Sequence, residues 1–271
     1  ACPHRMEFHH KGGIVFINRI CILGHSGIGK SNLARLFNVD GWEPFRVRKP
    51  RDAEDAKICM SPEEFERLRS TLESKKLLYE GDGGLKVYED WSLLKVRGKD
   101  QCLSHTPEAK SDRSLLRVEI FAPVLVQMLK NRDKRAGVFS LDPARTLVIL
   151  LNPTRTSFQG TDEPSQELRL STAFAVAERY RAAGKPVDLA DVIQRTEHLQ
   201  DELSAWREMF TTGAVVVECM NWEHFEYRYT ASGDTRMESR RARTALWQAI
   251  ERHAGLNERS RAAILNALPP F

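Results

Sequence analysis

An eight-residue segment near the start of the sequence has the composition and spacing of a loop that binds phosphate groups. Gly24-His25-Ser26-Gly27-Ile28-Gly29-Lys30-Ser31 fits the pattern G-x-x-x-x-G-K-[ST] without a substitution. The glycines of such a loop let the backbone curl so that successive N–H groups point at phosphate oxygens. We therefore expect Lys30 to reach the β- and γ-phosphates of a nucleoside triphosphate and the Ser31 hydroxyl to bind Mg²⁺.

The segments on either side of this loop are the elements that must position it. Residues 14–23 are largely apolar and β-branched, which predicts a buried strand. Leu33 and Phe37 recur at helical spacing, which predicts a helix directly after the loop. A phosphate-binding loop requires this order of strand, loop and helix, and the helix N-terminus adds the positive end of its dipole. His25 and Ser26 occupy variable positions of the pattern, so we assign them no chemistry.

Arginines elsewhere in the sequence are suited to binding further phosphate groups, since a guanidinium fork donates two parallel hydrogen bonds to phosphate oxygens. Arg48 and Arg51 follow the loop after a helix and a turn. Arg179 and Arg195 flank a Gly-Lys-Pro break in a helical segment. The alternative interpretations are a solvated basic turn for the first pair and an exposed helix face, with partners such as Asp191, for the second.

Several segments resemble the nucleoside monophosphate kinases of the guanylate kinase type, and they occur in the order of that family. Residues 48–54 look like the family's T-T-R-x-P-R-x-G-E segment, and residues 60–65 look like its V-S-x-E-E-F segment. Residues 115–120 resemble its acidic D-I-D strand. Residues 179–217 are similar to its lid, its I-x-x-R helix and its closing strand. The resemblance covers most of residues 14–220.

The resemblance implies a Mg²⁺-dependent kinase that transfers the γ-phosphoryl group of ATP to a phosphate-bearing acceptor, a nucleoside monophosphate such as GMP. A phosphate acceptor is already largely dianionic near neutral pH. The reaction therefore needs charge neutralisation and exclusion of water instead of a general base. The implied catalytic residues are Lys30, Arg179 and Arg195, which would neutralise the donor phosphates as the lid closes.

On the acceptor side, the resemblance assigns Arg48 and Arg51 to the acceptor phosphate and two carboxylates to the base. Glu80 and Glu119 match positions that accept hydrogen bonds from the guanine edge, whose N1–H and N2–H are adjacent donors. Glu119 has a second role open to it, as a hydrogen-bond acceptor beside Mg²⁺. The sequence departs from the family pattern where Arg46-Val47 replaces the paired threonines.

Three alternatives to this function stay open. A phosphosugar is an alternative acceptor, as in the ribose bisphosphate kinases that resemble this family. A non-catalytic guanylate-kinase-like interaction module is the second alternative, although such a module has no need of an intact Gly29-Lys30-Ser31. The third is a nucleotide-driven switch or a nucleic-acid-end kinase, which the basic C-terminal segment suggests.

Four apolar runs predict the strands of a central sheet, and they are residues 14–23, 115–121, 146–151 and 214–219. Helix-like segments separate these runs. That alternation is typical of an α/β fold, with a parallel sheet and helices on both faces. The sequence thus predicts a P-loop NTPase core that binds its ligands at the carboxyl ends of the strands.

The predicted organisation is a core with additions at both ends. Residues 1–13 form an N-terminal extension, residues 14–229 the kinase core, and residues 230–271 a C-terminal helical appendage. Within the core, residues 45–114 read as a polar, irregular insertion that binds the acceptor, and residues 167–210 as a helical lid. The appendage helices either pack on the core or form a homodimer contact, and the sequence does not decide between these roles.

The composition limits the classes of partner. The chain has 271 residues, of which 41% are hydrophobic, and this is enough for a packed interior. The formal net charge of +4 is too small to indicate nucleic acid, and no apolar run is long enough to span a bilayer. The five cysteines lack metal-binding spacing and fit a reducing, cytoplasmic setting. The expected ligands are ATP, Mg²⁺ and a phosphorylated small molecule.

Overall fold

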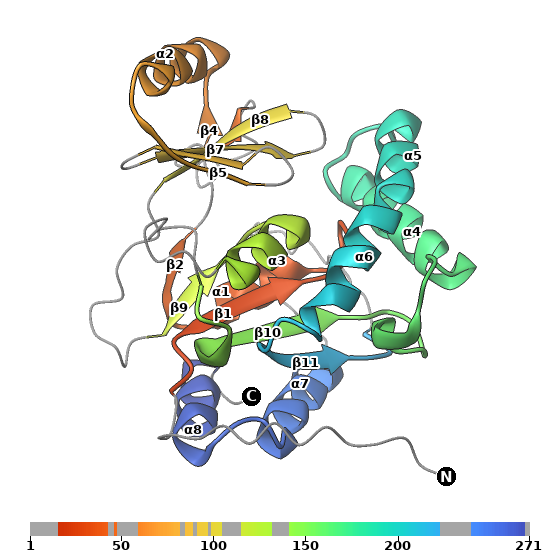
Figure 1. Ribbon diagram of the computed structural model, residues 1–271. Helices are drawn as coiled ribbons and strands as arrows, with labels where there is room; N and C mark the ends of the chain where they lie inside the picture. The colour runs from red at the N-terminus through yellow and green to blue at the C-terminus, as the bar shows by residue number, and fades with distance from the viewer. Residues whose placement is uncertain are drawn as a thin grey trace.

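The computed structural model has a parallel sheet at its centre with helices around it (Figure 1). The predicted site residues Arg48 and Arg51 and the extension 1–13 lie outside the residues that the structure describes. The described residues are 16–42, 46–47, 59–81, 85–88, 91–96, 99–104, 115–131, 141–222 and 240–268.

The central sheet has five strands in the order β11-β10-β1-β9-β2, and each neighbouring pair is parallel. The predicted α/β class with a parallel sheet is confirmed, and each of the four apolar runs contains one strand. The sequence does not predict β2, because its three residues form no apolar run. The strands are β1 (Arg19–Leu23), β2 (Asp40–Trp42), β9 (Leu116–Val118), β10 (Thr146–Leu151) and β11 (Val215–Cys219).

Both faces of this sheet are buried, as the continuous apolar runs indicate. All six residues of β10 are buried. Along β1, Cys21 and Leu23 pack with α3 and α6, whereas Ile20 and Ile22 pack with α1, α7 and α8. The helices that cover the two faces are α3 (Ala122–Lys130) and α6 (Leu199–Met209) on one side, and α1 (Lys30–Leu36), α7 (Arg240–Arg252) and α8 (Glu258–Ala267) on the other.

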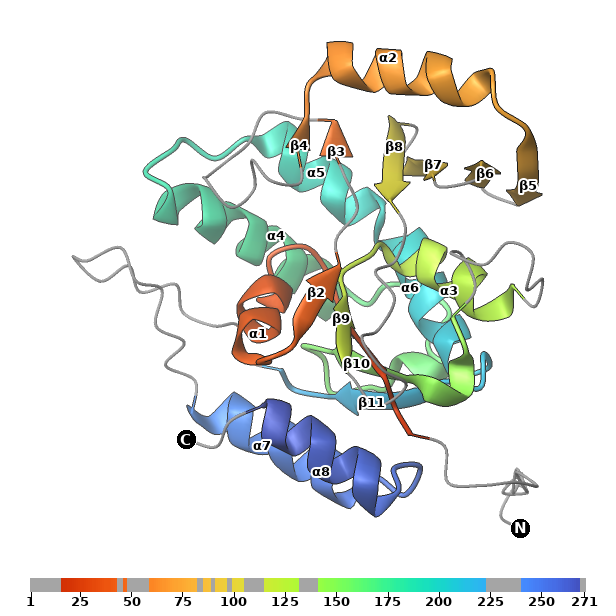
Figure 2. The ribbon, with the colours of Figure 1, turned by 90° about the vertical axis from the view of Figure 1, so that its left-hand side faces the viewer.

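The C-terminal helices α7 and α8 pack against the sheet on the side opposite to α3 and α6 (Figure 1 and Figure 2). Leu246, Ile250 and Ile264 are fully buried there. Of the two roles that the sequence leaves open for these helices, the structure shows packing on the core. Their apolar faces complete one of the two hydrophobic layers that hold β1 and β10 in place.

His253, at the end of α7, connects this layer to β11. The Gly255 N–H donates to His253 Nδ1 (3.1 Å), and His253 Nε2 lies 3.0 Å from the carbonyl oxygen of Val216. Because a carbonyl only accepts, Nε2 carries the proton and the ring is neutral. Burial lowers the pKa of His253, in agreement with a neutral ring.

The segment 45–114 differs from the irregular insertion that the sequence predicts. Its described residues form a helix, a two-stranded pair and a four-stranded antiparallel sheet in the order β5-β6-β7-β8 (Figure 1). The elements are β3 (Arg46–Val47), β4 (Cys59–Met60), α2 (Pro62–Glu73), β5 (Leu77–Gly81), β6 (Leu85–Tyr88), β7 (Trp91–Val96) and β8 (Lys99–Ser104).

The prediction of an irregular insertion is wrong because this sheet needs few apolar residues. A single amphipathic helix, α2, contributes Phe65 and Leu72 to a small cluster with Tyr88 and Leu93 of the sheet. Strands this short produce no long apolar run, even though Val87, on the opposite face from Tyr88, is also buried, in the main core cluster. The start of α2 is a capping box in which Ser61 Oγ accepts from the Glu64 N–H and the Glu64 carboxylate accepts from the Ser61 N–H.

The segment predicted as a lid forms three helices. α4 (Gln166–Ala182) ends before Gly184, whose φ of +63° is in the left-handed region, and α5 (Leu189–Glu197) begins after the cap residue Asp188. A second break at His198 separates α5 from α6. In Figure 1, α4 and α5 lie side by side at one end of the sheet.

Candidate functional site

The predicted phosphate loop, residues 24–29, joins β1 to α1 at the carboxyl edge of the sheet. After β1 the chain continues toward β2 on one side, whereas after β10, the neighbour of β1, it continues toward β11 on the other side. Ligands of open α/β sheets bind where adjacent strands diverge in this way. The loop therefore lies at the position in the sheet where a ligand site is expected.

The loop has the backbone conformation that its glycines allow. Gly24, Gly27 and Gly29 have φ values of +144°, +87° and +94°. A Cβ at Gly24 would lie 2.9 Å from the carbonyl oxygen of Leu151, and a Cβ at Gly27 would lie 2.9 Å from the Cβ of Ala175. Contacts this short exclude any side chain, so the loop is packed against the end of β10 and against α4.

The predicted phosphate ligand Lys30 folds back over the loop. Its Nζ donates to the carbonyl oxygens of Gly24 (2.6 Å) and His25 (2.7 Å). The ammonium group is thus placed within the curl of the loop. Ser31, the predicted Mg²⁺ ligand, is exposed in the first turn of α1.

His25, to which the sequence assigns no chemistry, connects the loop to α4. Its side chain is fully buried, with Nδ1 2.8 Å from the carbonyl oxygen of Ser26 and Nε2 3.2 Å from Ser171 Oγ. Because a carbonyl only accepts, Nδ1 carries the proton and Nε2 accepts from the Ser171 hydroxyl. The loop pattern tolerates many residues at this position, so no sequence signal distinguishes this histidine.

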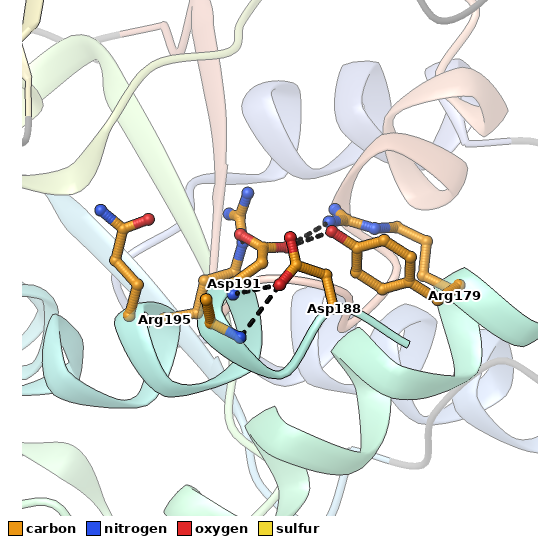
Figure 3. Close-up of a pocket in the computed structure, with 7 residues that line it drawn as sticks. Arg179, Asp188, Asp191 and Arg195 are labelled. Carbon is orange, nitrogen blue, oxygen red and sulfur yellow. Dashed lines mark hydrogen bonds and ion pairs between the residues drawn. The ribbon is translucent and has the colours of Figure 1, made fainter. Parts of the chain in front are cut away.

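The two predicted donor-site arginines come together at Asp191, although they belong to different helices (Figure 3). Arg195 Nε lies 2.8 Å from Asp191 Oδ1, and Arg179 Nη2 lies 3.4 Å from Asp191 Oδ2. The hydroxyl of Tyr180 also donates to Asp191 Oδ2, at 3.1 Å. Burial and this hydrogen bond raise the pKa of Tyr180. The cluster lines an open pocket of about 600 Å³.

Arg195 also contacts the phosphate loop itself. Its Nη1 donates to Ser26 Oγ at 2.9 Å, across 169 positions of sequence. Helix α5 of the predicted lid is therefore in contact with the predicted phosphate loop. The sequence leaves open both a phosphate-binding role and an ion pair with Asp191 for these arginines, and the structure contains the ion pair.

The two carboxylates assigned to the acceptor base lie in different sheets. Glu80, on β5, faces Lys86 on β6 with 3.6 Å between Oε1 and Nζ. Glu119, just after β9, lies 2.8 Å from Arg117 Nε, and Arg117 Nη1 donates to the carbonyl oxygen of Ala34 in α1 (2.8 Å). Each carboxylate is thus beside a cation of the protein.

A polar network that the sequence analysis does not identify fixes the loop after β10. Glu218 Oε1 accepts from Asn152 Nδ2 (2.7 Å) and from the Phe158 N–H (2.8 Å), and its Oε2 accepts from Ser157 Oγ (2.5 Å). Asn152 Oδ1 accepts from the Thr154 N–H at 2.8 Å. Asn152 and Thr154 follow a buried strand directly, which is the signal that could have indicated an ordered loop there. The network holds a second loop at the same edge of the sheet as the phosphate loop.

Within the described part of the chain, no group of three or more His, Cys, Asp or Glu side chains is placed to hold a metal ion. No helix among the described residues is long and apolar enough to cross a membrane.

The chain matches no protein-family model, and no curated protein is similar enough in sequence to identify a relative. The function is therefore inferred from the chemistry of the site.

Proposed function

We propose that this protein is a Mg²⁺-dependent phosphotransferase that moves the γ-phosphoryl group of ATP to a phosphate-bearing acceptor, a nucleoside monophosphate such as GMP. The observation that carries the proposal is the hydrogen bond from Arg195 of α5 to Ser26 of the phosphate loop. A phosphate loop alone would support triphosphate binding. An arginine brought to it by a separate helix supports transfer, because phosphoryl transfer is promoted by cations around the γ-phosphate.

In this proposal the donor half of the site consists of the phosphate loop, Lys30 and the two arginines. Lys30 turns its ammonium group from the carbonyl oxygens of Gly24 and His25 toward the β- and γ-phosphates. Arg179 and Arg195 approach the same phosphates from the helices α4 and α5. Mg²⁺ enters with the nucleotide and supplies further positive charge, and Ser31 is the residue proposed to bind it.

The acceptor half follows the resemblance, with Arg48 and Arg51 proposed to hold the acceptor phosphate. A phosphosugar is the second candidate acceptor, and one observation favours it. Glu80 and Glu119, the two carboxylates proposed for the guanine edge, lie beside Lys86 and Arg117. A guanine base would have to compete with these cations for the carboxylate oxygens, whereas a phosphosugar has no such requirement.

A test of the donor half is thermal melting of the full chain with and without ATP and Mg²⁺. A ligand at 100 times its dissociation constant stabilises the native state by about 2.7 kcal/mol, so the midpoint should rise. The variant K30A serves as the matched control and should show no rise. An unchanged midpoint for the wild-type chain at saturating ATP would refute the donor proposal and favour an interaction module.

A test of the acceptor half is formation of ADP from ATP with GMP, dGMP, AMP, CMP, UMP or a ribose bisphosphate. The proposal predicts ADP formation that depends on one of the nucleoside monophosphates. Activity with the sugar phosphate alone would select the second candidate. No turnover with any of them, in a chain that binds ATP, would refute both acceptors.

A further inference from the structure

The cluster of Arg179, Asp191 and Arg195, called here the arginine clamp, joins α4 to α5 (Figure 3). Arg195 also connects the clamp to the predicted phosphate loop through Ser26. We propose that Asp191 is a positioning residue that holds both arginines toward the donor phosphates before the nucleotide binds. This inference rests on the proposed function and deepens it, since it concerns the same donor site.

Asp191 uses both of its carboxylate oxygens in the clamp. Oδ1 accepts from Arg195 Nε, and Oδ2 faces Arg179 Nη2. With Nε directed at Asp191, the other side of the Arg195 fork is directed at the phosphate loop, where Nη1 donates to Ser26 Oγ. One planar guanidinium group therefore spans the distance from Asp191 to the loop. Asp191 thus binds Nε of Arg195 and leaves the Nη1 side of the guanidinium directed at the loop, where a phosphate would bind.

Both arginines need such a partner because their side chains are partly exposed, and Arg195 lies on α5, which has no fully buried residue among those described. None of the α5 residues that the structure describes is buried, and the side chains of Arg179 and Arg195 are 32% and 24% exposed. Long exposed side chains sample many rotamers, and that freedom is lost when they bind a ligand. Asp191, which is 18% exposed, restricts both arginines in the ligand-free protein. The entropy cost of ordering the two arginine side chains is then part of the free energy of folding and does not reduce the affinity for the nucleotide.

A carboxylate beside a triphosphate also repels it, and Asp188 provides the comparison that separates the two effects. Asp188 lines the same pocket. Its carboxylate accepts from the backbone N–H groups of Ala190 and Asp191 as the cap of α5. Asp188 thus carries the same charge in the same pocket, but its contacts are with backbone. Removal of its charge should only relieve repulsion.

The experiment compares D191N with D188N, because each variant removes one negative charge with almost no change in shape, and asparagine still caps a helix. Calorimetric titration of the full chain with Mg²⁺-ATP measures the dissociation constant for the wild type and both variants. We expect D191N to weaken binding about fivefold. D188N should bind at least as tightly as the wild type. D191E restores a carboxylate four residues before Arg195 and should recover at least half of the loss in binding free energy.

The experiment distinguishes a failure of the positioning role of Asp191 from a failure of the proposed function. If D191N binds Mg²⁺-ATP as tightly as D188N, the carboxylate only repels and the positioning role of Asp191 is refuted, while the proposed function stands. If the wild-type chain itself binds no Mg²⁺-ATP, the proposed function is refuted and the inference with it. Thermal melting of the ligand-free variants identifies a misfolded protein, and a D191N variant that melts like the wild type but binds weakly supports the inference.

Discussion

The two helices of the predicted lid, α4 and α5, are attached to the molecule in different ways. α4 buries Leu168, Thr172, Ala175 and Val176 against the core, and it contacts the phosphate loop through Ala175. Among the described residues of α5 none is buried, and Asp191 and Arg195 connect this helix by ion pairs and a hydrogen bond to α4 and to the predicted phosphate loop. The difference indicates that α4 is a rigid side of the site, here called the wall. α5, here called the cover, is attached mainly by ion pairs.

The difference follows from the apolar residues of the two helices. Thr172, Ala175 and Val176 lie on one face of α4, and that face is covered. The large apolar residues of α5, Leu189 and Ile193, are 69% and 56% exposed. A helix without a fully buried apolar side chain depends largely on its caps and polar contacts. A proposed lid motion should therefore involve α5 and leave α4 in place.

Truncation of an apolar side chain should affect the two helices very differently. Leu168 in α4 is 1% exposed. The variant L168A should lower the free energy of unfolding by about 3 kcal/mol. The matched variant I193A in α5 should cost about 0.5 kcal/mol or less. Denaturant titration of both variants measures the difference. Equal losses would mean that α5 is packed as firmly as α4.

The contact between the phosphate loop and α4 can be isolated with two glycines of positive φ. An alanine at Gly27 would collide with Ala175 at 2.9 Å, whereas no described atom lies within 4 Å of a Cβ at Gly184, between α4 and α5. Both variants place an alanine at positive φ, and the backbone strain is larger at Gly27 (φ +87°) than at Gly184 (φ +63°), which lies in the left-handed α region. G27A should be less stable than G184A by about 2 kcal/mol, as expected for overpacking. The two variants would differ only by this backbone strain if α4 could move away from the loop freely.

The hydrogen bond between His25 and Ser171 is a smaller contribution to the same wall. S171A removes the hydroxyl that donates to the buried Nε2 of His25 and should cost about 1 kcal/mol. The control is S204A in α6, where the exposed hydroxyl donates only to the carbonyl oxygen of Gln200 and should matter little. Denaturant titration compares the two serines. If S204A lowered the free energy of unfolding as much as S171A, the His25–Ser171 hydrogen bond would not specifically connect the loop to α4.

The attachment of α5 by charge should show in its response to salt. An increase from about 0.01 M to about 1 M salt shortens the Debye length from about 30 Å to about 3 Å and weakens partly exposed ion pairs. Amide exchange should then become faster by roughly twofold in α5, because the pairs of Asp191 with the arginines are weakened. Exchange in α4 should not change, since its attachment is apolar. A uniform response of both helices would contradict the comparison.

The elements around the phosphate loop could be predicted because their signals are local. The six apolar residues of β10 and the pattern of strand, glycine loop and helix are each contained in a short stretch of sequence. The antiparallel sheet of the insertion could not be predicted in the same way, since Tyr88 and Leu93 are buried by residues of α2 that lie elsewhere in the sequence. Val87 of the same sheet is buried by the main core, which is also distant in the sequence.

The candidate site follows the same rule. The motif identifies Gly24, Lys30 and Ser31 by spacing alone. The contact of Arg195 with Ser26 joins residues 169 positions apart, and that of His25 with Ser171 joins residues 146 positions apart. Such pairs form only when the helices are packed on the sheet, so single-sequence spacing cannot reveal them.

The most direct test of the donor site is amide hydrogen exchange of the full chain with and without a non-hydrolysable ATP analogue and Mg²⁺. The proposed function predicts slower exchange in the loop at residues 24–29 and in α5 when the analogue binds, because the phosphates hold the loop and the cover closes on them. α4, already fixed in the ligand-free protein, should change little. Exchange that is the same in the loop and in α5 with and without the analogue would contradict the proposed donor site.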